Sequence, residues 1–363
     1  GEIQAKIRLI KEQNAISLSG QIELKSGALE NKEKAIEVKG IEARFPIWYE
    51  KRKGKTAEKN ESFPGKGYFL IGELRTPYFS LPRLQVNFES AKNSFLIYPF
   101  SFDFFGGAVG MGESFLNIGE DLALTKGISS FSFTLGDLSR LPIKSSQFKL
   151  KGRLQTNLDP IEISSEVISA QDEVRINMFD GQIAVKNLKI SRPFSRGRVL
   201  SCDIAFKGLN LEKMTDSIPF GRVTGIVNGE IQDFALSYGQ PERFTLRLES
   251  EKRKGIPQKF SIGAVNDVAI LSSGDTASVS SVKKLSPFVR EFHYEKIGIF
   301  CSLKNDIFTL RGTIKEKGTE YLVKKSWLFG ISVINRDPQG KISFKEMLGR
   351  LKRIGSSRKD EGK

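Results

Sequence analysis

The feature that most constrains the fold of this chain is a repeated alternation of apolar and polar residues with a period of two. Phe131, Phe133 and Leu135 alternate with Ser and Thr residues, and the same pattern with Arg, Thr and Glu runs from Phe244 to Leu248. Successive side chains of a β-strand point to opposite faces, so this pattern predicts strands with one apolar and one solvated face. The sequence therefore predicts a mainly β fold.

Turn residues separate many of these alternating runs. Examples are Asp180-Gly181, Asn228-Gly229 and Pro338-Gln339-Gly340. By these signals the chain contains on the order of twenty strands. Short connections with few helices between them favour antiparallel pairing. A phase slip within Ile183–Ile190 predicts a β-bulge.

Three segments are candidates for short helices. Asp137–Leu141 and Leu211–Asp216 each have the length of a single turn, and Asp137 can cap the first of them. Ser281–His293 is a further candidate, although Pro287 interrupts it.

The clearest helix candidate is Phe344–Ile354. Ser343 and Glu346 have the spacing of a capping box at its start, and Gly355 can end it. Such a helix spans roughly 16 Å, too short to cross a bilayer core. Two interpretations remain open: a cap over the end of the sheet, or a docking element for an anionic membrane surface or an outer-membrane protein. The residues that would serve docking are Phe344, Met347, Leu348, Leu351, Arg350, Lys352 and Arg353.

An internal repeat suggests that the chain is built from similar groups of strands. Lys149–Leu154 aligns with Arg222–Val227, at an offset of 225 − 152 = 73 residues, and Phe105–Val109 resembles Phe179–Ile183. In the first alignment, apolar residues also match further along, with Leu158, Ile161 and Ile163 falling on Ile231, Phe234 and Leu236. End-to-end addition of such groups favours an elongated sheet over a compact sandwich.

Composition narrows the partners and the chemistry. The 363 residues carry a net charge of 57 − 42 = +15, which favours anionic partners. His293 is the one histidine, which removes most histidine-based metal and catalytic sites. Cys202 and Cys301 lie in phase with apolar neighbours, so we expect two buried free thiols. No run of apolar residues is long enough for a transmembrane helix. The chain begins at Gly1, so we expect it to be a fragment.

No motif predicts catalysis. The glycines of Gly106–Gly112 lack the spacing of a phosphate-binding loop and indicate a bulged strand pair. The polar stretch Lys51–Lys66 predicts a solvated loop. Nucleic acid is an unlikely partner, because Phe residues occupy the apolar phase of the strands while Lys and Arg occupy the opposite phase or loops. We therefore expect no enzyme, no cofactor and no metal.

The second half of the chain resembles the C-terminal region of the bacterial AsmA-like family, of the YdbH and TamB type. The segments that carry the resemblance are Met178–Ile183, Asn187–Pro193, Phe220–Ile231 and Tyr321–Val323. The resemblance implies a bridge-like lipid transporter: a long, curled, groove-forming antiparallel β-sheet in the periplasm, reaching towards the outer membrane from an inner-membrane anchor upstream. We expect three regions: an N-terminal β segment over 1–90 continuing an upstream sheet, a repeated groove with the AsmA-like C-terminal region over 91–335, and an amphipathic helix with a basic tail over 336–363.

Residues and resemblance together favour a non-enzymatic protein that binds phospholipid acyl chains for lipid transport between the membranes and envelope maintenance. A phospholipid exposes roughly thirty CH₂ groups, at about 0.8 kcal/mol each, and a continuous apolar sheet surface can offset that cost. The alternative is a structural envelope scaffold or adhesion stalk whose apolar face is a closed core. The residues expected to line the groove are Phe131, Phe133, Leu135, Ile183, Val185, Ile204, Phe206, Phe244, Leu246 and Leu248.

Overall fold

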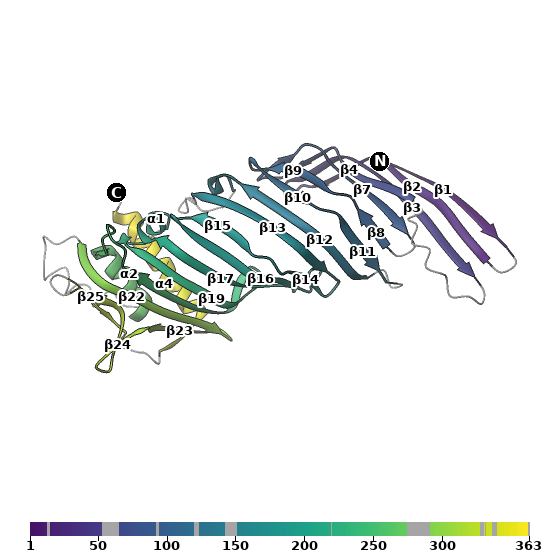
Figure 1. The fold of residues 1–363 in the computed structure, drawn as a ribbon. Helices are drawn as coiled ribbons and strands as arrows, with labels where there is room; N and C mark the ends of the chain where they lie inside the picture. Colours follow the sequence, from purple (N-terminus) through teal and green to yellow (C-terminus); the bar gives the residue numbers. More distant parts are fainter. Residues whose placement is uncertain are drawn as a thin grey trace. The chain divides into compact units, whose positions relative to one another are not determined.

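The computed structural model describes residues 1–12, 15–52, 65–91, 94–119, 123–141, 151–218, 220–273, 291–326, 330, 332–335 and 340–361 (Figure 1). Strands make up 67% of the structure, and their pairing is antiparallel. Three α-helices and one turn of 3₁₀-helix occur in the described ranges. These observations confirm the prediction of a mainly β, antiparallel fold with few helices and a helix at the C-terminal end.

Two compact units divide the chain. Unit 1 comprises residues 1–136, 155–172 and 192–194, and unit 2 comprises residues 137–154, 173–191 and 195–363. The three regions expected from the sequence, 1–90, 91–335 and 336–363, stay a prediction, as does the elongation of the sheet.

Most strands of unit 1 pair in one continuous series. The strands are β1 (Glu2–Lys11), β2 (Ala15–Asn31), β3 (Ile36–Arg52), β4 (Gly65–Ile71), β5 (Glu73–Arg75), β6 (Ser80–Leu81), β7 (Leu84–Ala91), β8 (Ser94–Ile97), β9 (Phe100–Phe104), β10 (Gly107–Met111), β11 (Ser114–Ile118), β12 (Leu124–Leu135), residues 155–163 of β13 (Gly152–Ile163), and β14 (Val167–Ala170). Pairing runs β1–β2–β3–β4–β7–β8–β11–β12–β10–β9. Of the predicted loop Lys51–Lys66, residues 53–64 lie outside the described ranges, whereas its first and last two residues belong to β3 and β4.

Unit 2 combines a sheet with the helices. Its strands are β15 (Val174–Met178), β16 (Gly181–Ser191), β17 (Val199–Asn210), β18 (Val223–Thr224), β19 (Ile226–Ser237), β20 (Gln240–Glu251), β21 (Lys259–Ser261), β22 (Glu291–Lys304), β23 (Ile307–Gly312), β24 (Ile314–Glu316), β25 (Thr319–Lys325), β26 (Val333–Ile334) and β27 (Lys341–Ser343). Its helices are η1 (Leu138–Arg140), α1 (Leu211–Thr215), α2 (Ile262–Ser273) and α4 (Phe344–Glu361). The main series of pairs is β15–β16–β17–β19–β20–β22–β23–β27.

Two-residue turns close the hairpins of both units. Phe105-Gly106, Phe179-Asp180, Tyr238-Gly239, Asn305-Asp306 and Lys317-Gly318 all have positive φ at both positions, the geometry that matches the twist of paired strands. The expected turn at Asp180-Gly181 is therefore present, one residue earlier, and the glycine loop at 106–112 begins with a tight hairpin. The two segments that resemble each other in sequence, around Gly107 and Gly181, both begin the second strand of such a hairpin.

The predicted turn at Asn228-Gly229 is wrong, because both residues lie inside β19. Gly229 pairs with Phe206 of β17 and Leu248 of β20. A Cβ atom on Gly229 would lie 2.7 Å from the Phe206 ring and 2.4 Å from the carbonyl oxygen of Arg247. The absence of a side chain at Gly229 therefore lets the neighbouring strands β17 and β20 approach closely. The expected bulge in β16 is confirmed, since the pairing register shifts between Lys186 and Lys189.

The two single-turn helices are confirmed. Asp137 caps η1 by accepting a hydrogen bond from the Ser139 backbone N–H at 2.9 Å. Asn210 caps α1 by accepting from the backbone N–H groups of Glu212 and Lys213 at 3.0 and 3.4 Å. Helix α1 thus begins one residue beyond a capping side chain that the sequence analysis had not singled out.

The other helix predictions need correction. Of the candidate Ser281–His293, residues 281–290 lie outside the described ranges, and its last three residues are not helical because they begin β22. Helix α4 starts as expected, with the Glu346 N–H donating to the Ser343 Oγ at 3.1 Å. It does not end at Gly355 but continues to Glu361, since a glycine inside a helix costs only about 1 kcal/mol. Helix α2 was not expected at all. No helix in the described ranges is long and apolar enough to span a membrane.

Candidate functional site

Apolar residues predominate on one face of unit 1, along β1, β2, β3, β4, β7 and β8 and again on β9, β10 and β12. Strand register places directly opposite residues on the same face. One cross-strand row reads Ile3, Leu24, Ala43, Phe69 and Val86, and the next reads Ala5, Ile22, Phe45, Gly67, Phe88 and Ile97. Ring contacts join Phe45 to Phe88 at 5.5 Å and Phe88 to Phe95 at 5.9 Å. We call this surface, with its continuation on β9, β10 and β12, the unit 1 apolar face.

Phenylalanines dominate the continuation. Phe102, Val109 and Phe133 form one row, and Phe100, Met111 and Phe131 form the next. The rings of Phe104 and Phe133 lie 6.1 Å apart. Phe131 and Phe133, which the sequence analysis assigned to the groove, are half-buried here, whereas Leu135 is only 1% exposed. The structure thus brings these three residues together on one face of unit 1.

The opposite face carries a polar row across β1, β2, β3, β4 and β7, whereas further along it Leu96, Phe115 and Ile128 form an apolar row. The row next to the first apolar row reads Gln4, Glu23, Arg44, Tyr68 and Asn87. Arg44 Nε donates to Glu23 Oε1 at 2.9 Å, and the Arg44 guanidinium lies 5.6 Å from the centre of the Tyr68 ring. Partial burial works to raise the pKa of Glu23, but the hydrogen bond and charge of Arg44, with the charge of Lys25, outweigh it and lower the pKa.

Little of the described structure covers the unit 1 apolar face. No helix of unit 1 occurs in the described ranges, and the two clusters of buried apolar side chains both belong to unit 2. Ile3, Leu9 and Phe45 are 73%, 66% and 44% exposed. Most other members of the face are half-buried by their neighbours within the sheet. This face is therefore a sheet surface with apolar side chains that water can reach.

The remaining seven predicted groove residues share one face of unit 2. Val185, Ile204, Ile231, Leu246 and Cys301 form one row across five strands. Ile183, Phe206, Gly229, Leu248 and Ile299 form the adjacent row, and Phe244 faces Leu303 in a third. The structure thus brings together Ile183, Val185, Ile204, Phe206, Phe244, Leu246 and Leu248 as expected; we call this surface the unit 2 apolar face.

Helices and a small second sheet cover much of the unit 2 apolar face. One buried cluster contains Val227, Val265 of α2 and Leu322 of β25, and Ile183, Phe206 and Leu248 pack against it. A second contains Cys301, Leu303, Phe308 and Met347 of α4, and Phe244, Leu246 and Phe344 pack against that. Figure 1 shows α2 and α4 on the strands of unit 2. Most of this face therefore belongs to a closed core.

Both cysteines are free and buried, as expected. Burial raises the pKa of the Cys301 thiol to about 12. Burial, with the charge of Asp203 adding to it, also raises the pKa of Cys202. Both groups therefore stay protonated, and thus poorly nucleophilic, near neutral pH.

Helix α4 divides the predicted docking residues between two environments. Phe344, Met347 and Arg350 pack inward, and the Arg350 guanidinium donates to the carbonyl oxygens of Leu271 and Ser272 at 2.9 and 3.1 Å. Arg350 therefore caps the C-terminal end of α2, which a basic side chain suits well. The exposed members of the predicted set are Leu348, Leu351, Lys352 and Arg353. The inward residues of α4 therefore act as a cover over unit 2, as the cap interpretation predicts. Only the exposed residues on the outward side of α4 could contact a partner.

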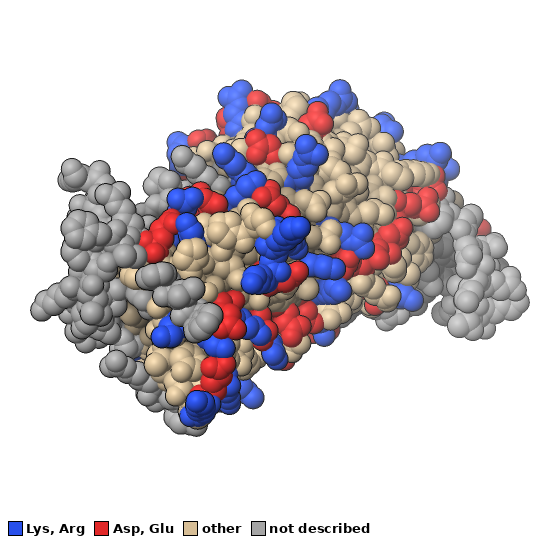
Figure 2. All heavy atoms as spheres, turned by 60° about the vertical axis from the view of Figure 1, so that its left-hand side comes forward, with Lys and Arg blue, Asp and Glu red and all other residues tan. Residues whose placement is uncertain are grey.

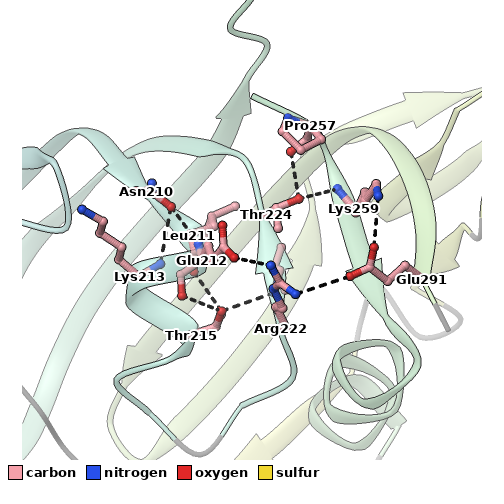
Figure 3. Close-up of polar contacts among 11 residues, drawn as sticks. Asn210, Leu211, Glu212, Lys213, Thr215, Arg222, Thr224, Pro257, Lys259 and Glu291 are labelled. Carbon is pink, nitrogen blue, oxygen red and sulfur yellow. Dashed lines mark hydrogen bonds and ion pairs between the residues drawn. The ribbon is translucent and has the colours of Figure 1, made fainter. Parts of the chain in front are cut away.

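A polar network that the sequence analysis missed holds α1 to its neighbouring strands (Figure 3). Arg222 forms an ion pair with Glu212 of α1 and lies 3.8 Å from Glu291. Lys259 forms a second ion pair with Glu291 at 3.1 Å. Thr224 Oγ1 donates to the Pro257 carbonyl at 2.8 Å and accepts from the Lys259 N–H at 3.1 Å. The residues are far apart in sequence, so no local motif signals the network. It is structural in character, since its charges neutralise one another.

No protein-family model, curated protein or solved structure matches this chain. Among the residues that the structure describes, no group of three or more His, Cys, Asp or Glu side chains could hold a metal ion. The unit 1 apolar face, whose side chains water can reach, is the candidate functional surface.

Proposed function

We propose that the chain is a non-enzymatic lipid-binding protein that shelters phospholipid acyl chains on the unit 1 apolar face. The observation that supports this proposal is the extent of that face: apolar rows cross β1, β2, β3, β4, β7 and β8, phenylalanines follow on β9 and β12, and described residues leave several of these side chains accessible to water. Exposed apolar area of this extent is unusual in a soluble domain and marks a surface that takes an apolar partner.

The chemistry of the face suits acyl chains. Its aromatic residues are mainly Phe, which has no polar group to satisfy, so a bound hydrocarbon leaves no donor or acceptor unpaired. Each buried CH₂ group contributes about 0.8 kcal/mol, so a chain lying along several rows is held without any specific contact. Binding of this kind is tolerant of chain length and lets a lipid slide between equivalent positions.

The cellular setting is proposed on the resemblance to the AsmA-like family. It places the protein in the periplasm, reaching towards the outer membrane from an anchor upstream, and assigns it to phospholipid transport between the membranes and envelope maintenance. An apolar face whose reverse side carries a polar row over β1, β2, β3, β4 and β7 is compatible with that role, because the polar row can face water while the apolar side carries lipid.

A structural envelope scaffold is the second candidate, and the covered face of unit 2 favours it for that unit. There the same type of alternating strand packs under α2, α4 and β25 instead of remaining accessible. If the unit 1 apolar face were covered in the same way in the cell by protein, the chain would be a scaffold throughout.

Site-specific photo-crosslinking separates the two candidates. A photoreactive amino acid at Phe133 should capture phospholipid in bacterial cells, and one at the next residue, Thr134, should not, because it lies on the opposite face with Ala108. Phe45 and Arg44 form a second matched pair on β3. Capture of protein in place of lipid at Phe133 and Phe45 would support the scaffold, and equal lipid capture within each pair would indicate non-specific adhesion.

A further inference from the structure

One end of the unit 2 strands carries exposed basic residues. Arg196 and Arg198 precede β17, whose first residue Val199 pairs with Ser237 at the end of β19. Arg243, near the start of β20, lies directly opposite Lys304 at the end of β22. All four side chains belong to exposed residues at the strand ends away from α1. We call these four residues the basic edge.

None of the four basic-edge residues forms an ion pair in the described structure; the pairs in unit 2 involve other side chains. Two acidic residues, Glu242 and Asp306, lie along the same strand ends. Asp306 is engaged locally, since its carboxylate and its carbonyl oxygen both accept from the Phe344 N–H, at 3.3 and 3.0 Å. The edge therefore keeps a net positive charge that faces solvent.

The opposite ends of the same strands differ. There several basic side chains are matched by acidic ones, in the pairs Lys213–Asp180, Arg222–Glu212, Lys259–Glu291 and Arg253–Glu251, whereas the exposed Lys252 and Lys254 form no ion pair in the described structure. Figure 3 shows part of this neutralised network. On the face drawn in Figure 2, basic and acidic side chains are likewise mixed. The basic edge differs from the opposite ends in that none of its four basic residues forms an ion pair in the described structure.

Apolar side chains accompany the basic edge. Tyr238, in the turn between β19 and β20, is 79% exposed, and Ile307, which pairs with Lys304, is 46% exposed. Tyrosine, with an apolar ring and a polar hydroxyl, is enriched where one end of a side chain is apolar and the other wet, as at a membrane interface. Basic residues beside such groups attract anionic head groups. A single-stranded nucleic acid would need a series of aromatic residues for successive bases. The exposed aromatic residues beside the edge are Tyr238 and Phe194, which lies two residues before Arg196 in the sequence.

We infer that the basic edge of unit 2 docks on a membrane surface that contains anionic phospholipid head groups. Arg and Lys side chains at the edge contact the phosphates, while Tyr238 and Ile307 enter the interfacial layer. This inference extends the proposed function by naming the surface with which lipid would be exchanged. Its evidence, however, is the charge and exposure of unit 2 and not the apolar face of unit 1.

Vesicle co-sedimentation tests the inference with matched variants. The edge variant R198Q/R243Q/K304Q and the control variant K252Q/R253Q/K254Q lose the same number of positive charges, and the control residues lie in an exposed turn at the opposite strand ends. We expect the full chain to bind phosphatidylcholine vesicles that contain phosphatidylglycerol and not vesicles of phosphatidylcholine alone. The edge variant should bind roughly 100-fold more weakly, as expected for three basic residues near an anionic surface, and the control variant should bind nearly as well as the parent chain.

Several results would overturn the inference: no binding by the parent chain, equal loss in both variants, or no loss in the edge variant. Preferential binding of a single-stranded oligonucleotide, lost in the edge variant, would overturn it in favour of nucleic acid. Circular dichroism should show both variants folded; if the edge variant is not, the single substitution R198Q, in a residue before β17, must weaken vesicle binding for the inference to stand. Lipid capture at Phe133 is measured separately, so failure of docking and failure of lipid binding are distinguishable.

Discussion

In unit 1 the side chain of Ile7 on β1 is 55% exposed, whereas in unit 2 Leu322 on β25 is fully buried. Both belong to alternating strands, and both units present one apolar face across paired strands. The units differ in what lies on that face: α2, α4 and β25 pack on unit 2, and unit 1 contains no helix within the described ranges. The comparison teaches that strand alternation defines an apolar face but does not decide whether the face becomes a core or a binding surface.

Thiol reactivity should show the largest difference between the units. Cys301 on the unit 2 apolar face has a pKa raised by burial from 9.0 to about 12, so its thiolate fraction at pH 8 is lowered about a thousandfold. In a Cys202→Ala background, iodoacetamide should therefore alkylate Cys301 about a thousandfold more slowly than the thiol introduced by Ile7→Cys. Mass spectrometry of timed samples measures both rates. Similar rates would mean that the cover over unit 2 opens readily, and the contrast between the units would fail.

Side-chain truncation should show the next largest difference. Leu322→Ala removes a fully buried side chain, and we expect it to lower the free energy of unfolding by about 2–5 kcal/mol. Ile7→Ala removes an exposed side chain and should cost about 0.5 kcal/mol or less. Urea unfolding followed by circular dichroism measures both changes. A large cost for Ile7→Ala would show that the unit 1 apolar face is covered in solution.

The sequence predicted the faces but not their cover, for physical reasons that particular residues make clear. Period-two alternation is local, so the shared face of Phe206 and Leu248 followed from the pattern of each strand. Helix α2 was missed because its apolar residues surround the helix instead of forming a stripe, which a short buried strand also would do. Its one local signal was Ser261, whose Oγ accepts from the Ala264 N–H at 3.2 Å.

Tertiary contacts explain why the sequence also misplaced Gly229 and Arg350. Gly229 resembles a turn residue, yet it sits inside β19 because Phe206 fills the space beside it. The basic residue Arg350 resembles a solvated neighbour of the apolar stripe on α4, yet it is buried because α2 ends beside it. Neither partner is close in sequence, so no window of neighbouring residues contains the information.

Substitution of Arg350 tests whether the contact between α4 and the end of α2 stabilises the cover over unit 2. Arg350→Met keeps the apolar stem but leaves the carbonyl oxygens of Leu271 and Ser272 without their donor, and we expect a loss of about 1–3 kcal/mol in the free energy of unfolding. Lys352→Met, two residues along and exposed, serves as the control and should change stability little. Thermal and urea unfolding measure both. Equal, small effects would show that α4 does not hold α2 on unit 2, and the unit 2 apolar face would then be as accessible as that of unit 1.

The polar side of unit 1 should show the smallest effect, and it completes the comparison. Arg44 forms its ion pair with Glu23 and lies over the Tyr68 ring, with 45% of its own side chain exposed. Exposed pairs of this kind contribute about 0.2–1 kcal/mol and weaken as salt screens them. Arg44→Met should therefore cost about 0.5 kcal/mol at low salt and less at high salt, measured by urea unfolding at two ionic strengths. A larger, salt-independent cost would mean that the polar face carries the stability of unit 1. The small cost expected here would instead show that this exposed ion pair adds little to the stability of unit 1.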